Sequence, residues 1–182
     1  EGILDRIHRV REAIPNVALR TSLIVGYPSE TEEEFAQLRS FVNEVEFDRL
    51  GVFTYSHEPG TIAYEQQDDI PNQVKYDRKD EIMLLQQDIM LEKNRSRIGD
   101  TLKVLIDEYD AGNREFLGRT EWDSPDVDGI VRIQAPETAA SVGEFYQVHI
   151  TDCNEYELFG NLVEPHFEFG AIEKRKTHSD VL

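Results

Sequence analysis

The apolar residues of this 182-residue sequence change their spacing once, close to Gly99. Before that point, apolar stripes at helical spacing alternate with short apolar runs rich in branched residues. After it, the apolar runs become short and alternating, and turn residues separate them. Alternating helices and strands are typical of a parallel α/β unit, whereas closely spaced short strands are typical of a small barrel or sandwich. We therefore expect a chain with one unit of each kind.

Residues 1–71 are predicted to form part of a larger parallel α/β domain. Two strands cannot close a barrel, so we expect apolar surface at an open sheet edge, which also offers a route to self-association. The chain begins inside a predicted helix and without Met, which indicates a piece of a longer protein. The expected elements are a helix at 3–14 whose stripe faces a core, a buried strand at 17–25, a helix introduced by the capping box Thr31–Glu34, and a strand at 49–55.

The rest of the chain is predicted to contain a linking helix, a barrel and a tail. Residues 72–97 contain no Gly or Pro, and their apolar positions recur at helical spacing, so one long helix is expected there. Residues 98–163 are predicted to form a small, closed, five-stranded antiparallel barrel of the oligonucleotide-binding type. Residues 164–182 are polar and predict a tail. The five expected strands lie at 101–109, 115–121, 129–133, 145–151 and 156–163.

Few residues of this sequence are candidates for chemistry. Cys153 is the single cysteine, which excludes a disulfide framework and any cysteine-ligated metal site built from this chain alone. The five histidines show no metal-ligand spacing, so we predict no metal ligand and no catalytic residue. No apolar run reaches the roughly 18 residues that cross a bilayer, and no signal peptide is visible. We therefore expect a cytoplasmic protein that does not enter a membrane.

The formal net charge of −18 limits the partners. In residues 98–163, Lys103, Arg114, Arg119 and Arg132 stand against fourteen Asp and Glu, a net charge of −10. Binding to nucleic acid needs clustered Lys and Arg, so this acidity argues against it and favours a basic protein partner. Trp122, among acidic neighbours, is either an exposed anchor for that partner or an aromatic packed under the barrel.

Three groups of residues carry a resemblance to a known family. Residues 19–35, an apolar strand running into Gly26-Tyr27-Pro28-Ser29-Glu30-Thr31, resemble the fifth barrel strand and following helix of the radical-SAM methylthiotransferases. Residues 47–61 are more specific and are similar to the RimO branch, which methylthiolates an aspartate of ribosomal protein uS12. Residues 118–120, 125–129 and 155–160 resemble the C-terminal TRAM domain of that branch. The chain is thus identified as a C-terminal fragment of such an enzyme, and the resemblance covers residues 1 to about 163.

This resemblance implies a cofactor set that the chain does not hold by itself. The family uses S-adenosylmethionine (SAM) and two 4Fe–4S clusters, and the three-cysteine motif that ligates the SAM-binding cluster is absent here. We therefore expect the isolated chain to be catalytically inactive. The fold it implies is the C-terminal part of an incomplete TIM-type barrel, a linking helix and a TRAM barrel. A small departure is Ser29, where relatives often have Gly.

The same resemblance suggests which residues face the cofactor and the substrate. Residues at the carboxyl ends of barrel strands line TIM-barrel sites, so Ile24 and Tyr55 are expected to pack against adenine and Gly26 to let the backbone approach. Ordinary core and turn roles are the alternative. Arg20 meets either a carboxylate in the site or a surface ion-pair partner. The acidic TRAM domain is expected to dock the basic uS12; the rival interpretations are a tRNA methylthiotransferase fragment and an RNA-binding module, which would need a basic stripe.

Overall fold

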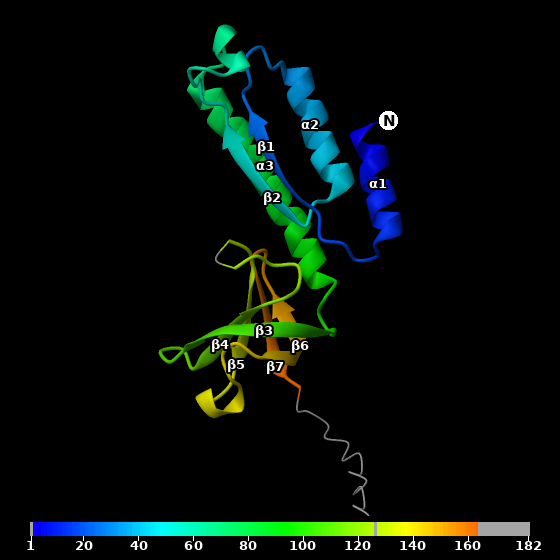
Figure 1. The fold of residues 1–182 in the computed structure, drawn as a ribbon, viewed down its shortest axis with the longest axis vertical. Coiled ribbons are helices and arrows are strands. Elements are labelled where there is room, and N and C mark those ends of the chain that lie inside the picture. The colour runs from blue at the N-terminus through cyan, green and yellow to red at the C-terminus, as the bar shows by residue number, and fades with distance from the viewer. Residues whose placement is uncertain (1, 126, 164–182) are drawn as a thin grey trace, which may run out of the picture.

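A single long helix connects the two units of the molecule. The computed structural model describes residues 2–125 and 127–163, and the predicted tail at 164–182 lies outside them. Figure 1 shows α3 running from the α/β unit down to the barrel. The elements are α1 (Ile3–Ala13), β1 (Arg20–Val25), α2 (Glu32–Val45), β2 (Arg49–Thr54), η1 (Ile62–Glu65), α3 (Asn72–Arg95), β3 (Thr101–Asp110), β4 (Glu115–Arg119), β5 (Ile130–Gln134), η2 (Glu137–Ala139), β6 (Phe145–Cys153) and β7 (Glu157–Leu162).

The α/β unit is built on a parallel pair of strands. β1 and β2 pair in register from Arg20↔Arg49 to Val25↔Thr54, as the two apolar runs predict. The capping box of α2 is also confirmed: the Glu34 backbone N–H donates to the Thr31 hydroxyl at 3.2 Å, and the Thr31 N–H donates to the Glu34 carboxylate at 2.8 Å. α2 and α3 cover one face of the strand pair. The core on that face consists of Val25, Phe35, Val42, Val52, Ile82 and Ile89.

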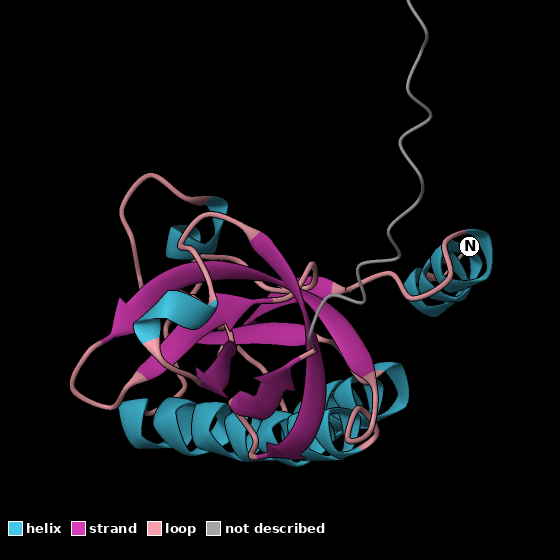
Figure 2. Ribbon diagram, turned by 90° about the horizontal axis from the view of Figure 1, so that it is seen from below, coloured by secondary structure: helices cyan, strands magenta, loops and turns pink. Residues whose placement is uncertain are grey.

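The other face of the strand pair is open. Ile24 and Phe53 are cross-strand neighbours on it and keep 59% and 58% of their surface exposed, which agrees with the expected apolar surface of an unclosed sheet. The predicted core contact of α1 is wrong, because this helix has no buried residue and lies to one side of the other helices (Figure 2). Helical spacing identifies an amphipathic stripe but does not identify what covers it.

The second unit is a closed five-stranded barrel with the strand order β3-β4-β5-β7-β6. The prediction that it is antiparallel throughout is wrong, since β5 and β7 pair in parallel from Ile130↔Glu157 to Ile133↔Gly160. The chain crosses from β5 to β6 through η2 and then returns between β6 and β5. Alternating apolar residues look the same in parallel and antiparallel strands, so the sequence pattern carried no information on this pairing.

The barrel has its own core, separate from that of the α/β unit. The inward side chains are Val104, Ile106, Phe116, Val131, Ile133, Val148, Ile150 and Leu158. Burial alternates along β6, where Val148 and Ile150 are buried and His149 is exposed. None of the helices in the part of the chain that the structure describes combines the length and apolar character needed to cross a membrane.

Candidate functional site

The three predicted cofactor-facing residues lie at the carboxyl ends of β1 and β2 but not on one surface. Ile24 points to the open face of the sheet, beside Phe53. Gly26 follows β1 with φ of 71°, a left-handed conformation that glycine adopts without strain. Tyr55 follows β2, is 9% exposed, and its backbone N–H donates to Val25 O at 2.9 Å. Of the three, only Ile24 presents a largely free side chain.

The space beside Gly26 is filled by Lys75 of α3. A Cβ atom placed on Gly26 would lie 2.3 Å from Lys75 Cγ, so a glycine is needed for this side chain to pass. Lys75 is 2% exposed, and its ammonium donates to both carboxylate oxygens of Asp68 at 2.6 and 2.8 Å. The same ammonium lies 5.1 Å from the centre of the Tyr55 ring. Gly26 therefore admits a buried ion pair rather than a ligand on that side.

Tyr55 belongs to an aromatic group at this end of the sheet. Its hydroxyl lies 3.1 Å from His57 Nδ1, and its ring meets the edge of Tyr27 at a centroid distance of 5.4 Å. Burial raises the pKa of the Tyr55 phenol above its ordinary value, and the charge of Asp68 acts in the same direction. The raised pKa favours the protonated phenol, and the direction of its hydrogen bond with His57 depends on the tautomer of the imidazole.

A second buried cation, Arg78, ties the loop after β1 to α3. Arg78 is 5% exposed and pairs with Glu30 at 2.6 Å and with Glu32 at 2.5 Å. Glu30 in turn accepts a hydrogen bond from the Gly26 backbone N–H at 3.1 Å. The sequence prediction missed both buried cations of α3. A signal was present, because Lys75 and Arg78 extend the stripe that contains Ile82 at helical spacing.

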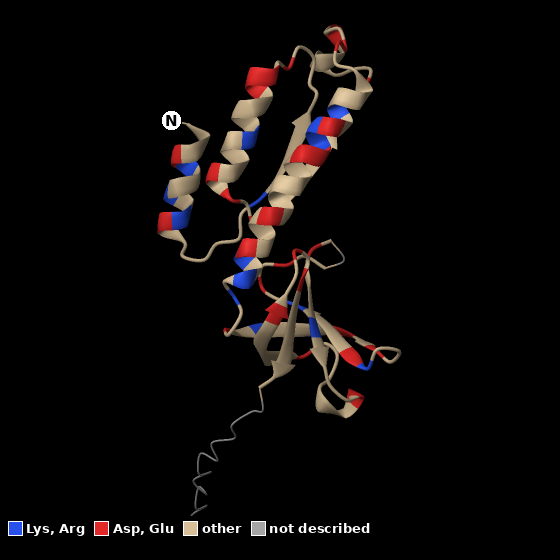
Figure 3. Ribbon diagram, turned by 180° about the vertical axis from the view of Figure 1, so that it is seen from behind, with Lys and Arg blue, Asp and Glu red and all other residues tan. Residues whose placement is uncertain are grey.

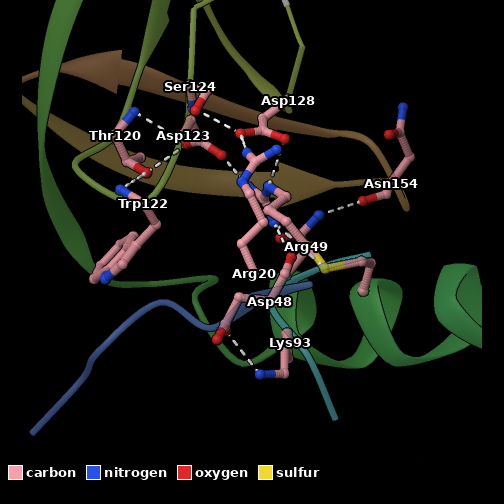
Figure 4. A network of polar contacts seen from close by, with 12 residues as sticks. Arg20, Asp48, Arg49, Lys93, Thr120, Trp122, Asp123, Ser124, Asp128 and Asn154 are labelled. Carbon is pink, nitrogen blue, oxygen red and sulfur yellow. Dashed lines mark hydrogen bonds and ion pairs between the residues drawn. The ribbon is translucent and has the colours of Figure 1, made fainter. Parts of the chain in front are cut away.

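The opposite, amino-terminal ends of the two strands meet the barrel (Figure 4). Arg20 forms an ion pair with Asp128, and Arg49 forms one with Asp123. Arg49 Nε also lies 3.6 Å from Asp128 Oδ1. The carboxylate that Arg20 meets is therefore on the second unit of the same chain and not in a cofactor site. Seventy-four residues separate Arg49 from Asp123, so sequence spacing did not identify this pair.

Trp122 is a contact between the two units. Its indole N–H donates to Asn16 O at 3.0 Å, and the Arg97 guanidinium lies 3.8 Å from the ring centre. Burial lowers the pKa of the Arg97 guanidinium, while the charges of Asp123 and Asp48 oppose that shift. The partly buried Trp122 side chain thus lies between the two units and not under the barrel, so the second interpretation is wrong, while its use as an anchor for a partner stays a prediction.

Comparisons with known proteins agree with this architecture. The family model of the TRAM domain matches residues 98–163. A protein of Cytophaga hutchinsonii is 46% identical over 160 residues, which cover 88% of this chain and 36% of that protein. Proteins of Flavobacterium psychrophilum (49% over 150 residues; 82% and 34%) and Bacteroides thetaiotaomicron (43% over 164 residues; 90% and 37%) are similar as well. All three bear the name ribosomal protein uS12 methylthiotransferase RimO. The chain belongs to the RimO family.

The chain spans about a third of the length of the RimO proteins that it matches. No group of three or more His, Cys, Asp or Glu that could hold a metal ion occurs among the described residues. Cys153 is partly buried, and burial raises the pKa of its thiol, with Asp152 acting in the same direction. A raised pKa disfavours the thiolate that metals bind. The described part of this RimO-family chain therefore does not fit a 4Fe–4S cluster.

Some acidic residues of the TRAM barrel form ion pairs with arginines of the same chain. Asp123 and Asp128 neutralise Arg49 and Arg20, while Arg132 pairs with Glu115 at 2.5 Å and Glu157 at 2.8 Å. In the ribbon of Figure 3, red segments that mark Asp and Glu recur along the barrel, with few blue segments that mark Lys and Arg. Exposed carboxylates that enter no ion pair with a described residue include Glu108, Glu137 and Glu144. These three carboxylates leave part of the barrel's negative charge exposed to solvent.

Proposed function

We propose that this chain is part of a SAM-dependent enzyme that methylthiolates the β-carbon of an aspartate in ribosomal protein uS12. The observation that carries the proposal is an identity of 43–49% to RimO proteins over 82–90% of the chain, which includes both units. In the whole enzyme, bound SAM and two 4Fe–4S clusters supply the radical and sulfur chemistry. The described residues fit no cluster, so we expect this chain alone to be inactive.

The open sheet face is our proposed contribution to SAM binding. Ile24 and Phe53 form an exposed apolar pair near the carboxyl ends of the strands, where ligands of barrel enzymes bind. An adenine ring buries apolar area well against such a surface. Gly26 and Tyr55 belong to this proposal as the rim that shapes the site, held by Lys75 and Glu30. Self-association through the open edge of the same sheet stays a prediction.

The TRAM barrel is our proposed docking surface for uS12. Ribosomal proteins are usually strongly basic, and complementary charge speeds their encounter with an acidic surface. The barrel carries a net charge of −10 over residues 98–163, and Glu108, Glu137 and Glu144 leave part of it exposed. This negative net charge also disfavours binding of RNA, because its phosphates are bound by Lys and Arg side chains.

Neutralising the barrel's free carboxylates is expected to weaken binding of uS12. We expect the triple variant Glu108→Gln/Glu137→Gln/Glu144→Gln to bind uS12 roughly tenfold more weakly, since exposed ion pairs contribute roughly 0.2–1 kcal/mol each. The measurement is titration calorimetry at about 0.15 M salt, where the Debye length is roughly 8 Å. The matched control Glu12→Gln/Glu33→Gln/Glu44→Gln removes three exposed charges from α1 and α2 and should bind like the parent chain.

The same titration separates the rival functions. Binding of uS12 without binding of a tRNA anticodon stem-loop supports the proposed docking. Equal loss in the two triple variants would show that net charge, and not the barrel surface, determines affinity. Preference for the stem-loop would make the tRNA-modifying branch, or an RNA-binding module, the better assignment.

A further inference from the structure

Two arginines and two aspartates join the α/β unit to the TRAM barrel. Arg20 and Arg49 are the first residues of β1 and β2 and are direct register partners, so their side chains leave the same end of the sheet. Asp123 and Asp128 lie on the loop between β4 and β5, with side chains 5% and 4% exposed. Four charges from two units thus meet at one place, where both carboxylates are buried and the Arg20 side chain stays 46% exposed. We call this group the arginine–aspartate clasp (Figure 4).

The two carboxylates are held in place by their own loop. The Thr120 backbone N–H and hydroxyl donate to Asp123 Oδ2 at 3.1 and 2.5 Å, and the Ser124 N–H donates to Asp128 Oδ2 at 2.6 Å. These bonds orient each carboxylate before the arginines arrive, so the pairs cost little additional side-chain entropy. Because the carboxylates are buried, salt screens the clasp much less than it screens an exposed pair.

Four further contacts join the barrel to the rest of the chain around the clasp. The Trp122 side chain bonds Asn16 O and stacks on Arg97. The Asn94 side-chain amide donates to Asn154 O at 2.9 Å, and Gln87 donates to the Tyr156 hydroxyl. These contacts reach the barrel from the segment before β1 and from two turns of α3. Contacts at several separate points restrict rotation of the barrel more than a contact at a single point would.

Backbone hydrogen bonds also hold the connection between α3 and the barrel. Five residues, Ser96 to Asp100, join α3 to β3. The Ile98 N–H donates to Arg95 O at 3.1 Å, and the Gly99 N–H donates to Ile150 O of β6 at 2.9 Å. The clasp therefore adds to a connection that is itself hydrogen-bonded to α3 and to the barrel.

We propose that Arg20 and Arg49 are positioning residues that hold the TRAM barrel in one orientation below the amino-terminal ends of β1 and β2. The barrel is then fixed at the other end of the sheet from Ile24 and Tyr55. These residues lie four and six positions along the chain from Arg20 and Arg49, which is about 13 and about 20 Å in an extended strand. The consequence of this inference rests on the proposed function: a substrate docked on the barrel would keep a constant place relative to the cofactor. The orientation itself is a property of the chain alone.

The test is a distance distribution between spin labels on the two units of the whole chain. Labels at Gln37→Cys on α2 and Ala111→Cys on the β3–β4 turn, both exposed, are introduced with Cys153→Ser. We expect one narrow distribution in this parent and at least a doubled width in Asp123→Asn/Asp128→Asn. The asparagines keep the shape and still accept the loop hydrogen bonds, and circular dichroism verifies that both units stay folded. The control Arg39→Gln removes the ion pair between Arg39 and Glu81, which lies within the α/β unit. Its distance distribution should stay as narrow as that of the parent.

A charge-exchange variant tests whether restoring an ion pair also restores the orientation of the barrel. Arg49→Asp/Asp123→Arg restores one pair with its polarity reversed and should narrow the distribution relative to Arg49→Asp alone. An unchanged width in the asparagine variant would overturn the proposal. A broadened width in the asparagine variant, together with unchanged binding of uS12 by Glu108→Gln/Glu137→Gln/Glu144→Gln, would support the clasp and overturn the docking surface, so the two failures are distinguished.

Discussion

Gly160→Ala is expected to destabilise the TRAM barrel by about 3 kcal/mol or more. A Cβ atom on Gly160 would lie 2.6 Å from His149 O and 2.7 Å from Val148 Cγ1. Gly160 sits in β7 between β6 and β5, where it pairs with Ile150 and Ile133, so the neighbouring backbone cannot move without breaking strand pairs. In a closed barrel, a shift of one strand is transmitted to the others, and no free edge absorbs it.

The measurement for this prediction is urea unfolding followed by the fluorescence of Trp122, the only tryptophan of the chain. Gly143→Ala is the matched control: its φ is 87°, and nothing lies within 4 Å of the added Cβ. The free energy of unfolding of that control should fall by about 1 kcal/mol, which is the cost of a left-handed conformation for alanine. Equal shifts of the urea midpoint in the two variants would contradict the steric explanation.

Asp68→Ala is expected to cost the α/β unit about 3 kcal/mol, because it leaves the buried Lys75 ammonium without a counter-charge. Lys75→Met should cost no more than about 1 kcal/mol. The two changes differ because Lys75 is 2% exposed, whereas Asp68 is 28% exposed and can turn to water when its partner is lost. Thermal unfolding by circular dichroism measures both.

The double variant Asp68→Ala/Lys75→Met tests whether the unpaired Lys75 charge causes the loss of stability in Asp68→Ala. It removes both charges and should recover most of the stability lost in Asp68→Ala. If Lys75→Met were as damaging as Asp68→Ala, the ion pair would contribute net stability by attraction, and the asymmetry argued from burial would be wrong. The exposed pair Arg39–Glu81 supplies a reference, since removing Glu81 should change stability by no more than about 1 kcal/mol.

The order and kind of the elements followed from the sequence, because helix and strand periodicities are local properties. The capping box of α2 and the length of α3 are examples. The parallel pairing of β5 with β7 did not follow, because it depends on the path of the chain between them. The core contact expected for α1 failed for a similar reason, since an amphipathic stripe does not specify its cover.

The positions of the proposed cofactor-facing residues followed from the sequence, whereas their role in binding a cofactor stays a prediction. Ile24, Gly26 and Tyr55 do lie at the carboxyl ends of adjacent strands, where the resemblance put them. Their surroundings depend on Lys75 and Asp68, which approach from a helix and a loop distant in sequence. A lysine in a helix is ordinarily solvated, so only the three-dimensional arrangement identifies one that is buried.

The arginine–aspartate clasp also limits how the barrel can be exchanged between related enzymes. A TRAM barrel grafted from a relative brings its own loop between β4 and β5, but Arg20 and Arg49 stay behind with the host strands. A donor loop without carboxylates at the positions of Asp123 and Asp128 leaves two guanidinium groups unmatched at the junction. Chimeras that change the substrate therefore have to transplant charge pairs together with the domain, or the graft loses both ion pairs of the clasp and keeps only its other contacts and its five-residue connection to α3.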